Sequence, residues 1–234
     1  MNIAVLSDIH GNHFALKQVL VDLKRKKVDK IIILGDIVGY YYHPEKVFEL
    51  LSEWDYIAIK GNHEVILQLI YENKIDTKEV KRKYGSGHEI AIKNLTKSEL
   101  FYLFNLPQQR ELILDDVSFQ LNHGAPWDQE EYLYPDTKIE KLLKCNSINH
   151  NFVLVGHSHY SFSFDCGNSI LINSGSVGQS RKKGGIANWV LIDTNSKSYE
   201  INDTLYEIDE LLLEINKFDP NNKYLKEVLL RQNN

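Results

Sequence analysis

Short apolar runs alternate in the first part of the chain with segments whose apolar residues recur at helical spacing. The runs Ile3–Leu6, Ile31–Leu34 and Tyr56–Ile59 are continuous, which predicts strands that are buried on both faces of a sheet. Apolar residues recur three and four positions apart from Phe14 onward, and a second helix is predicted to begin near Pro44. The pattern therefore predicts βαβ units around a central sheet.

The middle of the chain has a helical pattern and the part that follows is rich in strands. A helical insertion is predicted over about residues 64–105, where Thr96 and Glu99 match a capping box that starts a new helix. Asp115-Asp116 predicts the turn of a hairpin. Further strands are predicted at Phe152–Val155, Phe162–Phe164, Ile170–Ile172 and Trp189–Ile192.

Length and composition fit one globular domain over residues 1–234. The apolar fraction of 43% and the charged fraction of 25% exclude a disordered chain. Amphipathic spacing over about residues 205–232 predicts C-terminal helices that pack on the domain or form a dimer contact, so homo-oligomerisation stays open. The net charge of −5 does not demand a nucleic acid partner, although bound divalent cations would add local positive charge.

The cysteines, the N-terminal residues and the lengths of the apolar runs indicate where in the cell the protein is expected. Cys145 and Cys166 form no CxxC pair, which favours reduced thiols. The N-terminus has no basic region before its short apolar run, and no window approaches the roughly 18 apolar residues that a membrane span needs. We therefore expect a cytoplasmic protein with no membrane partner.

Polar residues that can carry chemistry follow the predicted strands directly. They occur in Ser7-Asp8-Ile9-His10, Gly35-Asp36, Gly61-Asn62-His63-Glu64, Asn122-His123-Gly124 and Gly156-His157-Ser158-His159. Ligands of open α/β sheets bind beyond the carboxyl ends of the strands. His10 follows Asp8 by two residues, and in extended backbone such residues face the same way, so we expect the pair to converge on one point. The same holds for His157 and His159.

These residue types suit metal-assisted hydrolysis. Carboxylates and imidazoles without thiolate favour Mn²⁺, Fe, Zn²⁺ or Ni²⁺ over an all-oxygen Mg²⁺ or Ca²⁺ site. A carboxylate can bridge two cations, and a water activated by the metal ions supplies the nucleophile. Two carboxylates against two divalent ions leave the site positive, which favours a phosphate substrate.

The five segments, in this order, resemble the motif set of the calcineurin-like metallophosphoesterase superfamily over residues 1 to about 193. Ser7–Asn12 and Asn173–Arg181 are similar to the small prokaryotic phosphodiesterase branch related to diadenosine tetraphosphate hydrolases. The resemblance implies an α/β fold, a two-sheet αββα sandwich of the metallophosphoesterase type in which two mixed sheets pack together with helices outside.

The resemblance also implies roles for individual residues. One metal ion would be bound by Asp8, His10 and His159, a second by Asn62, His123 and His157, with Asp36 as the bridge between them. His63 would contact the phosphate and protonate the leaving oxygen, which suits an imidazole near neutral pH. We expect two divalent transition-metal ions, Mn²⁺ first, with Fe, Zn²⁺ and Ni²⁺ as alternatives.

Several residues near these motifs keep two interpretations. Asn12 is expected either to cap the first helix or to contact substrate, and Arg181 either to bind a phosphate oxygen or to lie in a surface loop. The remaining histidines are interpreted as surface or structural residues: His13, His43, His88 and His150. The Asp-Arg-Gly of the protein Ser/Thr phosphatase branch is absent after Gly35-Asp36, which argues against protein dephosphorylation.

The sequence therefore predicts a metal-dependent phosphoesterase that acts on small phosphate esters, with diesters preferred to monoesters and a nucleotide among the candidate substrates. Hydrolysis of dinucleoside polyphosphates is the alternative within the enzyme class. The alternative outside it is a binding scaffold, since one retromer subunit has this fold and works through partner contacts; the intact ligand set favours the enzyme. Specificity is expected from Tyr40–Tyr42, Glu72–Gly87 and Ala125–Tyr134, and whether the helical insertion forms a lid stays open.

Overall fold

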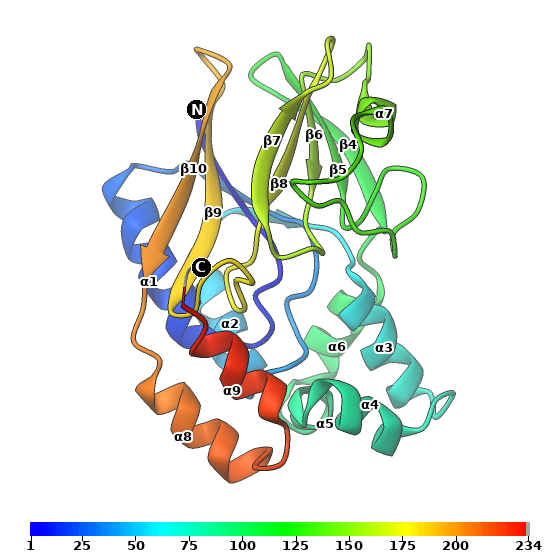
Figure 1. The fold of residues 1–234 in the computed structure, drawn as a ribbon, viewed down its shortest axis with the longest axis vertical. Coiled ribbons are helices and arrows are strands. Elements are labelled where there is room, and N and C mark those ends of the chain that lie inside the picture. The colour runs from blue at the N-terminus through cyan, green and yellow to red at the C-terminus, as the bar shows by residue number, and fades with distance from the viewer. Residues whose placement is uncertain (233–234) are drawn as a thin grey trace.

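Two mixed β-sheets form the centre of the molecule (Figure 1). The computed structural model describes residues 1–232. Within them the first sheet has the strand order β10-β9-β1-β2-β3. Its strands are β1 (Asn2–Leu6), β2 (Lys30–Ile33), β3 (Tyr56–Ala58), β9 (Ile186–Asp193) and β10 (Ser198–Leu205). β1, β2 and β3 run parallel, whereas β9 is antiparallel to both of its neighbours.

The second sheet has the order β4-β5-β6-β8-β7. Its strands are β4 (Gln109–Leu114), β5 (Val117–Asn122), β6 (Phe152–Val155), β7 (Ser161–Asp165) and β8 (Ile170–Ser174). The predicted hairpin is confirmed, because β4 pairs antiparallel with β5 across Asp115 and Asp116. Both aspartates have positive φ, 47° and 61°, which is the backbone of a type I′ turn.

The two sheets enclose one hydrophobic core between them. Val5 and Ile32 of the first sheet are completely buried in the same cluster as Phe119 and Leu154 of the second. The alternate residues of β1, Ala4 and Leu6, point the other way and pack in the cluster that contains the helices. The continuous apolar runs are thus explained by burial on both faces.

Helices cover the outer faces of both sheets. The outer face of the first sheet packs on α1 (His13–Arg25), α2 (Pro44–Leu51), α3 (Asn62–Tyr71), α5 (Gly87–Asn94) and α6 (Lys97–Phe104). The second sheet is covered by α7 (Ile139–Leu142), the 3₁₀ helix η1 (Leu143–Cys145) and the chain around Leu133. The predicted α/β sandwich is confirmed.

The segment predicted as a helical insertion contains α3, α4 (Thr77–Tyr84), α5 and α6. The capping box at the start of α6 is also found: Thr96 Oγ1 accepts from the Glu99 N–H at 3.2 Å, and Glu99 Oε2 accepts from the Thr96 N–H at 2.7 Å. These two bonds satisfy backbone donors that a helix start leaves free.

The C-terminal helices begin later than predicted. Leu205 is the last residue of β10, and the helices are α8 (Asp209–Phe218) and α9 (Lys223–Leu229). β10 escaped the sequence analysis because it is an edge strand whose residues are mostly exposed and polar, so it has no apolar run. Leu211 of α8 and Leu225 of α9 pack against Tyr40–Tyr42, as the packing interpretation predicted.

Two further observations concern membrane insertion and the cysteines. Among residues 1–232, no helix has the length and apolar character that crossing a bilayer requires. Cys145 and Cys166 are both buried and both are free thiols.

Candidate metal centre

The polar segments that follow β1, β2, β3, β5 and β6 converge at the carboxyl ends of these strands. The expectation that the Asp8–His10 and His157–His159 pairs converge through extended backbone is wrong. All four residues have left-handed φ values, between 53° and 65°. Asp and His adopt this conformation more readily than most residues, and it turns both side chains of each pair inward.

Asp8, His10 and His159 form one group of side chains whose ligand atoms lie within 4.8 Å of one another. His159 Nε2 is 3.1 Å from Asp8 Oδ1, and His10 Nε2 is 3.2 Å from His159 Nε2. Asp8 Oδ1 is buried without a hydrogen-bond donor within the described part of the chain.

Asp36, His123 and His157 form a second such group. His123 Nε2 lies 3.3 Å from Asp36 Oδ2, 3.1 Å from His157 Nδ1 and 3.0 Å from Asn62 Oδ1. Asp36 Oδ2 is also 3.8 Å from His10 Nε2, so this carboxylate lies between the two groups.

Backbone carbonyls fix the tautomers of three of these imidazoles. His10 Nδ1 donates to Val38 O at 3.1 Å, His123 Nδ1 to Leu34 O at 2.7 Å and His159 Nδ1 to Gln179 O at 2.7 Å. Because a carbonyl only accepts, each of these Nδ1 atoms carries a proton, so Nε2 carries a lone pair wherever the ring is neutral.

The facing lone pairs test whether the site fits a metal ion. His10 Nε2 and His159 Nε2 face one another with no proton to share, beside the undonated oxygen of Asp8. Such an arrangement of buried acceptors is unfavourable unless a cation lies among them. Carbonyl-oriented imidazoles are also the usual surroundings of metal-bound histidine. The donor set therefore fits divalent cations.

The two carboxylates are ionised at neutral pH. Burial opposes ionisation of both, but the neighbouring imidazoles in their protonated form, chiefly His159 for Asp8 and His123 for Asp36, hold each carboxyl pKa well below its usual range. Burial lowers the pKa of His123, whereas the Asp36 carboxylate outweighs it and raises that pKa to about 10. A bound cation would take the place of this proton.

Glu64 orders the backbone around Asp36, a role that the sequence analysis did not give it. Its carboxylate is wholly buried and accepts from four backbone N–H groups, those of Gly61, Asp36, Ile37 and Val38, at 2.8–3.2 Å. Burial and the nearby Asp36 raise the pKa of Glu64 to about 7. Glu64 stands three residues after the N-cap Gly61, the position from which a Glu side chain reaches back to the N-cap N–H, and this spacing is the signal that would have pointed to it.

His63 forms a third such group with His10 and Asp36, and it is paired with His88. His63 Nδ1 is 3.1 Å from His88 Nε2, and the rings stack with centroids 4.9 Å apart. His88 is 1% exposed, so of its two interpretations, surface or structural, only the structural one remains, and it contacts the predicted acid directly. Burial lowers the pKa of His63 well below its usual value and that of His88 to about 4, so both rings are neutral near pH 7.

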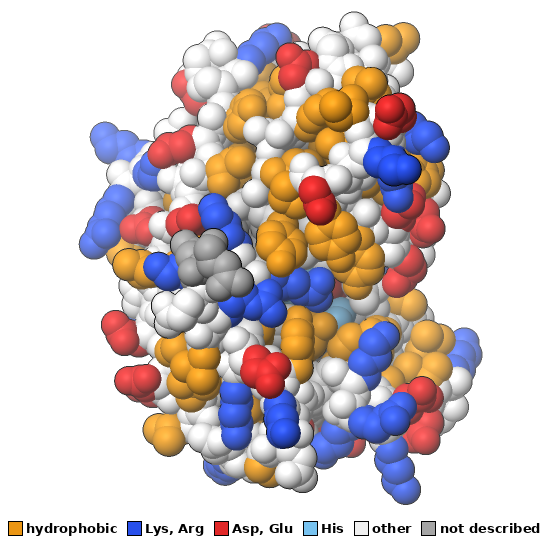
Figure 2. Space-filling view, in the orientation of Figure 1, with side chains coloured by type: hydrophobic (Ala, Val, Ile, Leu, Met, Phe, Trp, Pro, Cys, Tyr) orange, Lys and Arg blue, Asp and Glu red, His pale blue; other side chains and the backbone are white. Residues whose placement is uncertain are grey.

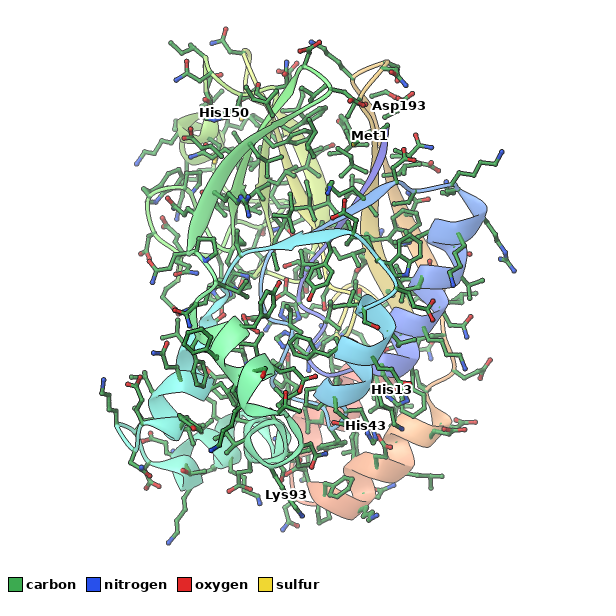
Figure 3. All side chains as sticks on the ribbon, turned by 180° about the vertical axis from the view of Figure 1, so that it is seen from behind. Met1, His13, His43, Lys93, His150 and Asp193 are labelled. Carbon is green, nitrogen blue, oxygen red and sulfur yellow. The ribbon has the colours of Figure 1, made fainter. Side chains whose placement is uncertain are left out.

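The other three histidines have structural surroundings. His43 bonds Glu45 and Glu214, and His150 bonds Ser147. His13 and His43 lie side by side, whereas His150 is at the opposite end of the molecule (Figure 3).

Asn12 has a structural role. It is completely buried, its Oδ1 accepts from the Ala15 N–H at 3.1 Å as the N-cap of α1, and its Nδ2 donates to Gly178 O and Tyr206 Oη. Both amide hydrogens are thereby engaged. The capping interpretation is confirmed, and the structure leaves Asn12 no free donor for a substrate.

Arg181 lies at the edge of the candidate centre. Its backbone N–H donates to His159 O at 3.2 Å, and its Nε is buried without an acceptor among the described residues. It lines a surface cleft together with Tyr40 and Tyr132, so its side chain faces an open space and not the packed interior.

The chain resembles known proteins over most of its length. Residues 1–197 match the family model of the calcineurin-like phosphoesterase superfamily domain. Uncharacterized protein MJ0912 of Methanocaldococcus jannaschii is 32% identical over 217 residues, which cover 85% of each chain. Serine/threonine-protein phosphatase 2 of Escherichia coli is 25% identical over 201 residues, 77% of this chain and 90% of that one.

A solved structure agrees with the sequence matches. The crystal structure of a metallophosphoesterase from Sphaerobacter thermophilus aligns with a TM-score of 0.76 and 25% identity over 98% of both chains. The chain belongs to the calcineurin-like phosphoesterase superfamily, and it is a hydrolase that acts on phosphoric ester bonds.

Proposed function

We propose that this protein hydrolyses small phosphate esters with a dinuclear metal centre that shares Asp36. The observation that carries the proposal is the position of Asp36 Oδ2, 3.3 Å from His123 Nε2 and 3.8 Å from His10 Nε2. One carboxylate oxygen thus faces the ligand atoms of both groups. Asp8, His10 and His159 would hold the first ion, and Asn62, His123 and His157 the second.

Two bound divalent ions would polarise the phosphoryl oxygens and lower the pKa of a water that attacks phosphorus. We propose Mn²⁺ as the metal, because the donors are carboxylate, imidazole and amide oxygen without thiolate, which also admits Fe, Zn²⁺ or Ni²⁺. Glu64 accepts from the N–H groups of Asp36, Ile37, Val38 and Gly61, so hydrogen bonds within the protein hold the loop that carries the proposed bridge.

His63 is the proposed general acid. His88 Nδ1 is buried without a partner in the described chain, and a free N–H there costs more than a free lone pair, so the His88 proton belongs on Nε2. It then donates to His63 Nδ1, which leaves the His63 proton on Nε2. Transfer of this proton requires the imidazolium form of His63, in which His63 Nδ1 donates to His88 Nε2 and which the negative charge of a bound phosphate ester would favour. As water adds to phosphorus and the ester P–O bond breaks, the Nε2 proton then passes to the leaving oxygen and His63 returns to its neutral form.

The substrate is proposed to be a small ester, with diesters preferred to monoesters. The E. coli relative is named as a protein phosphatase, but the Asp-Arg-Gly of that branch is absent here. The corresponding segment is Gly39–Tyr42, in which Tyr40, Tyr41 and Tyr42 are all buried. No cation comes from this segment to hold a phosphomonoester dianion.

The test is hydrolysis of bis(4-nitrophenyl) phosphate beside 4-nitrophenyl phosphate, after chelation and restoration of Mn²⁺, Fe²⁺, Zn²⁺ or Ni²⁺ in turn. We expect turnover that depends on the restored metal and is faster for the diester. Elemental analysis should find close to two ions per chain in the wild type and fewer in Asp36→Asn. Protein that binds no transition metal near neutral pH would refute the proposal, and bound metal without turnover of either ester would favour a binding scaffold.

The His63 assignment has its own test. His63→Ala should abolish most turnover while the bound metal stays at the wild-type level, because His63 is not among the proposed ligands. Full activity in that variant would exclude His63 as the acid.

A further inference from the structure

A cleft of about 580 Å³ opens beside the candidate metal centre, within the usual size range of small-ligand sites. Among the described residues its lining consists of six tyrosines and three cationic side chains, with no carboxylate. Figure 2 shows Lys and Arg side chains between hydrophobic groups across the middle of this face, with a histidine surface beside them. The cleft thus combines flat aromatic surfaces with positive charge.

Two tyrosines on one wall form an aromatic platform that begins at the metal centre. The Tyr132 ring stacks on His157, with centroids 3.9 Å apart and planes at 19°. The Tyr134 ring lies nearly parallel to Tyr132, with centroids 5.7 Å apart and planes at 7°. Tyr132 is 39% exposed, so its ring is accessible to a ligand and not part of the packed core.

Two further tyrosines of the lining, Tyr40 and Tyr84, also reach the centre. Tyr40 packs edge-on against His10 at 4.7 Å and contacts His63 at 4.8 Å between ring centroids. Tyr84 approaches His63 at 4.7 Å. The cleft therefore lies next to both groups of proposed ligands and next to the proposed acid, where the rest of a bound ester must extend.

The cations come from three distant parts of the chain. Lys83 lies in α4 with its Nζ 4.7 Å from the Tyr84 ring centroid, and Arg231 follows α9 and donates to Arg181 O at 2.6 Å. Arg181 keeps a buried Nε without an acceptor in the described chain. The scissile phosphate would already be held by the metal ions, so three further cations exceed what one phosphate needs.

We propose that this cleft binds the remainder of a nucleotide substrate, with the base stacked on Tyr132 and Tyr134 and a second phosphate held by Lys83, Arg181 and Arg231. Stacking of a base on an aromatic side chain accepts any base, and Arg suits the oxygens of a phosphate. The inference rests on the phosphoesterase activity proposed above, and it adds the class of substrate: a nucleotide with a phosphate beyond the one that is hydrolysed.

The experiment measures how strongly ADP, adenosine and inorganic phosphate inhibit hydrolysis of bis(4-nitrophenyl) phosphate, with Mn²⁺ in excess over nucleotide. ADP should inhibit at a concentration at least about tenfold below that of either adenosine or phosphate, because it alone uses both the platform and the cations. Equal inhibition by ADP and phosphate would overturn the proposal.

Substitutions locate the effect within the cleft. Tyr132→Ala should raise the inhibition constant of ADP about tenfold relative to that of phosphate, and Tyr132→Phe, which keeps the ring, should restore it. Lys83→Gln should raise the constant for ADP more than that for adenosine. The matched control is Lys93→Gln, an exposed lysine of α5 on the far side of the helical region (Figure 3), which should change neither. ADP and phosphate constants that shift together in Tyr132→Ala would refute the base platform.

Failure of this inference can be told from failure of the proposed function. If wild-type protein hydrolyses the reporter but ADP inhibits it no better than phosphate does, the proposed function stands and the proposed nucleotide site is rejected. Protein without metal-dependent turnover contradicts the function, and calorimetric titration of ADP into the metal-loaded chain then tests the cleft directly: binding that is weakened in Tyr132→Ala supports it, and no binding rejects it.

Discussion

Gly39 offers a test of His63 that leaves every proposed ligand intact. Its backbone has φ +96°, and a Cβ at this position would lie 2.1 Å from His63 Nδ1 and 2.9 Å from His63 Cγ. Ordinary contacts of this kind begin at 3.4 Å, so the His63 ring would have to retreat by about 1.3 Å, the difference between 3.4 and 2.1 Å. In Gly39→Ala the pairing of His63 with His88 should therefore be broken.

The expected loss follows from this displacement. General acid catalysis contributes about 10²–10⁴-fold, and a misplacement of about 1 Å can cost about 10²-fold. We expect kcat for bis(4-nitrophenyl) phosphate to fall about 10²-fold in Gly39→Ala, which corresponds to about 2.7 kcal/mol in the barrier. The bound metal should stay at the wild-type level. An alanine in left-handed backbone also costs about 1–2 kcal/mol of stability, so the Tm should fall as well.

A second glycine separates backbone strain from displacement of His63. Gly167 has φ +105°, and a Cβ there would meet only Asn146 Nδ2, at 3.9 Å. Gly167→Ala should carry the same backbone cost without loss of activity. The double variant Gly39→Ala/His63→Ala should be no slower than His63→Ala, because both changes act on one group. Wild-type kcat in metal-loaded Gly39→Ala, or an equal loss in Gly167→Ala, would refute this reasoning.

Three further predictions concern His88, the metal ions and His13. His88→Ala should lower kcat about tenfold at unchanged metal content, because the hydrogen bond that orients His63 is lost, and His88→Gln should recover part of the kcat. Equal activity of His88→Ala and wild type in the same reporter assay would exclude a positioning role. Chelation should lower the Tm, since an ion at one hundred times its Kd stabilises the folded state by about 2.7 kcal/mol. The same calorimetric Tm with and without Mn²⁺ would contradict binding of the metal to the folded chain. Burial, with the positive charge of Lys46, lowers the pKa of His13 to about 4, so the unfolded chain binds the extra proton between pH 6.5 and 4 and stability is lost as the pH falls through that window. Because His13 is only half-buried and solvent screens its charge, we expect it to account for a loss of about 1 kcal/mol in the free energy of unfolding. In urea unfolding of the chelated protein, His13→Gln should lose correspondingly less stability than wild type between pH 7 and 4.5. An identical pH dependence of wild type and variant would reject the assignment.

The sequence by itself determined the buried strands and the place of the polar segments after them. Runs such as Ile31–Leu34 are continuous because both faces of a strand between two apolar layers are buried, and that pattern is local. The capping box of Thr96 and the turn at Asp115-Asp116 are likewise properties of four consecutive residues. The strand β10 was missed because an exposed edge strand leaves no apolar pattern to detect.

Only the tertiary structure decided how the candidate site is assembled. His88 lies 25 residues after His63, and nothing in the local sequence marks it as the neighbour of that ring; their contact depends on how α5 packs. The left-handed backbone of Asp8 and His10 is imposed by hydrogen bonds to Gly35 and Asp36 on the adjacent loop. The cleft unites Lys83, Tyr132 and Arg231, which lie far apart in the sequence. Local patterns report burial and backbone preference, whereas contacts between distant side chains depend on the packing of the whole chain, which a short window of sequence does not contain.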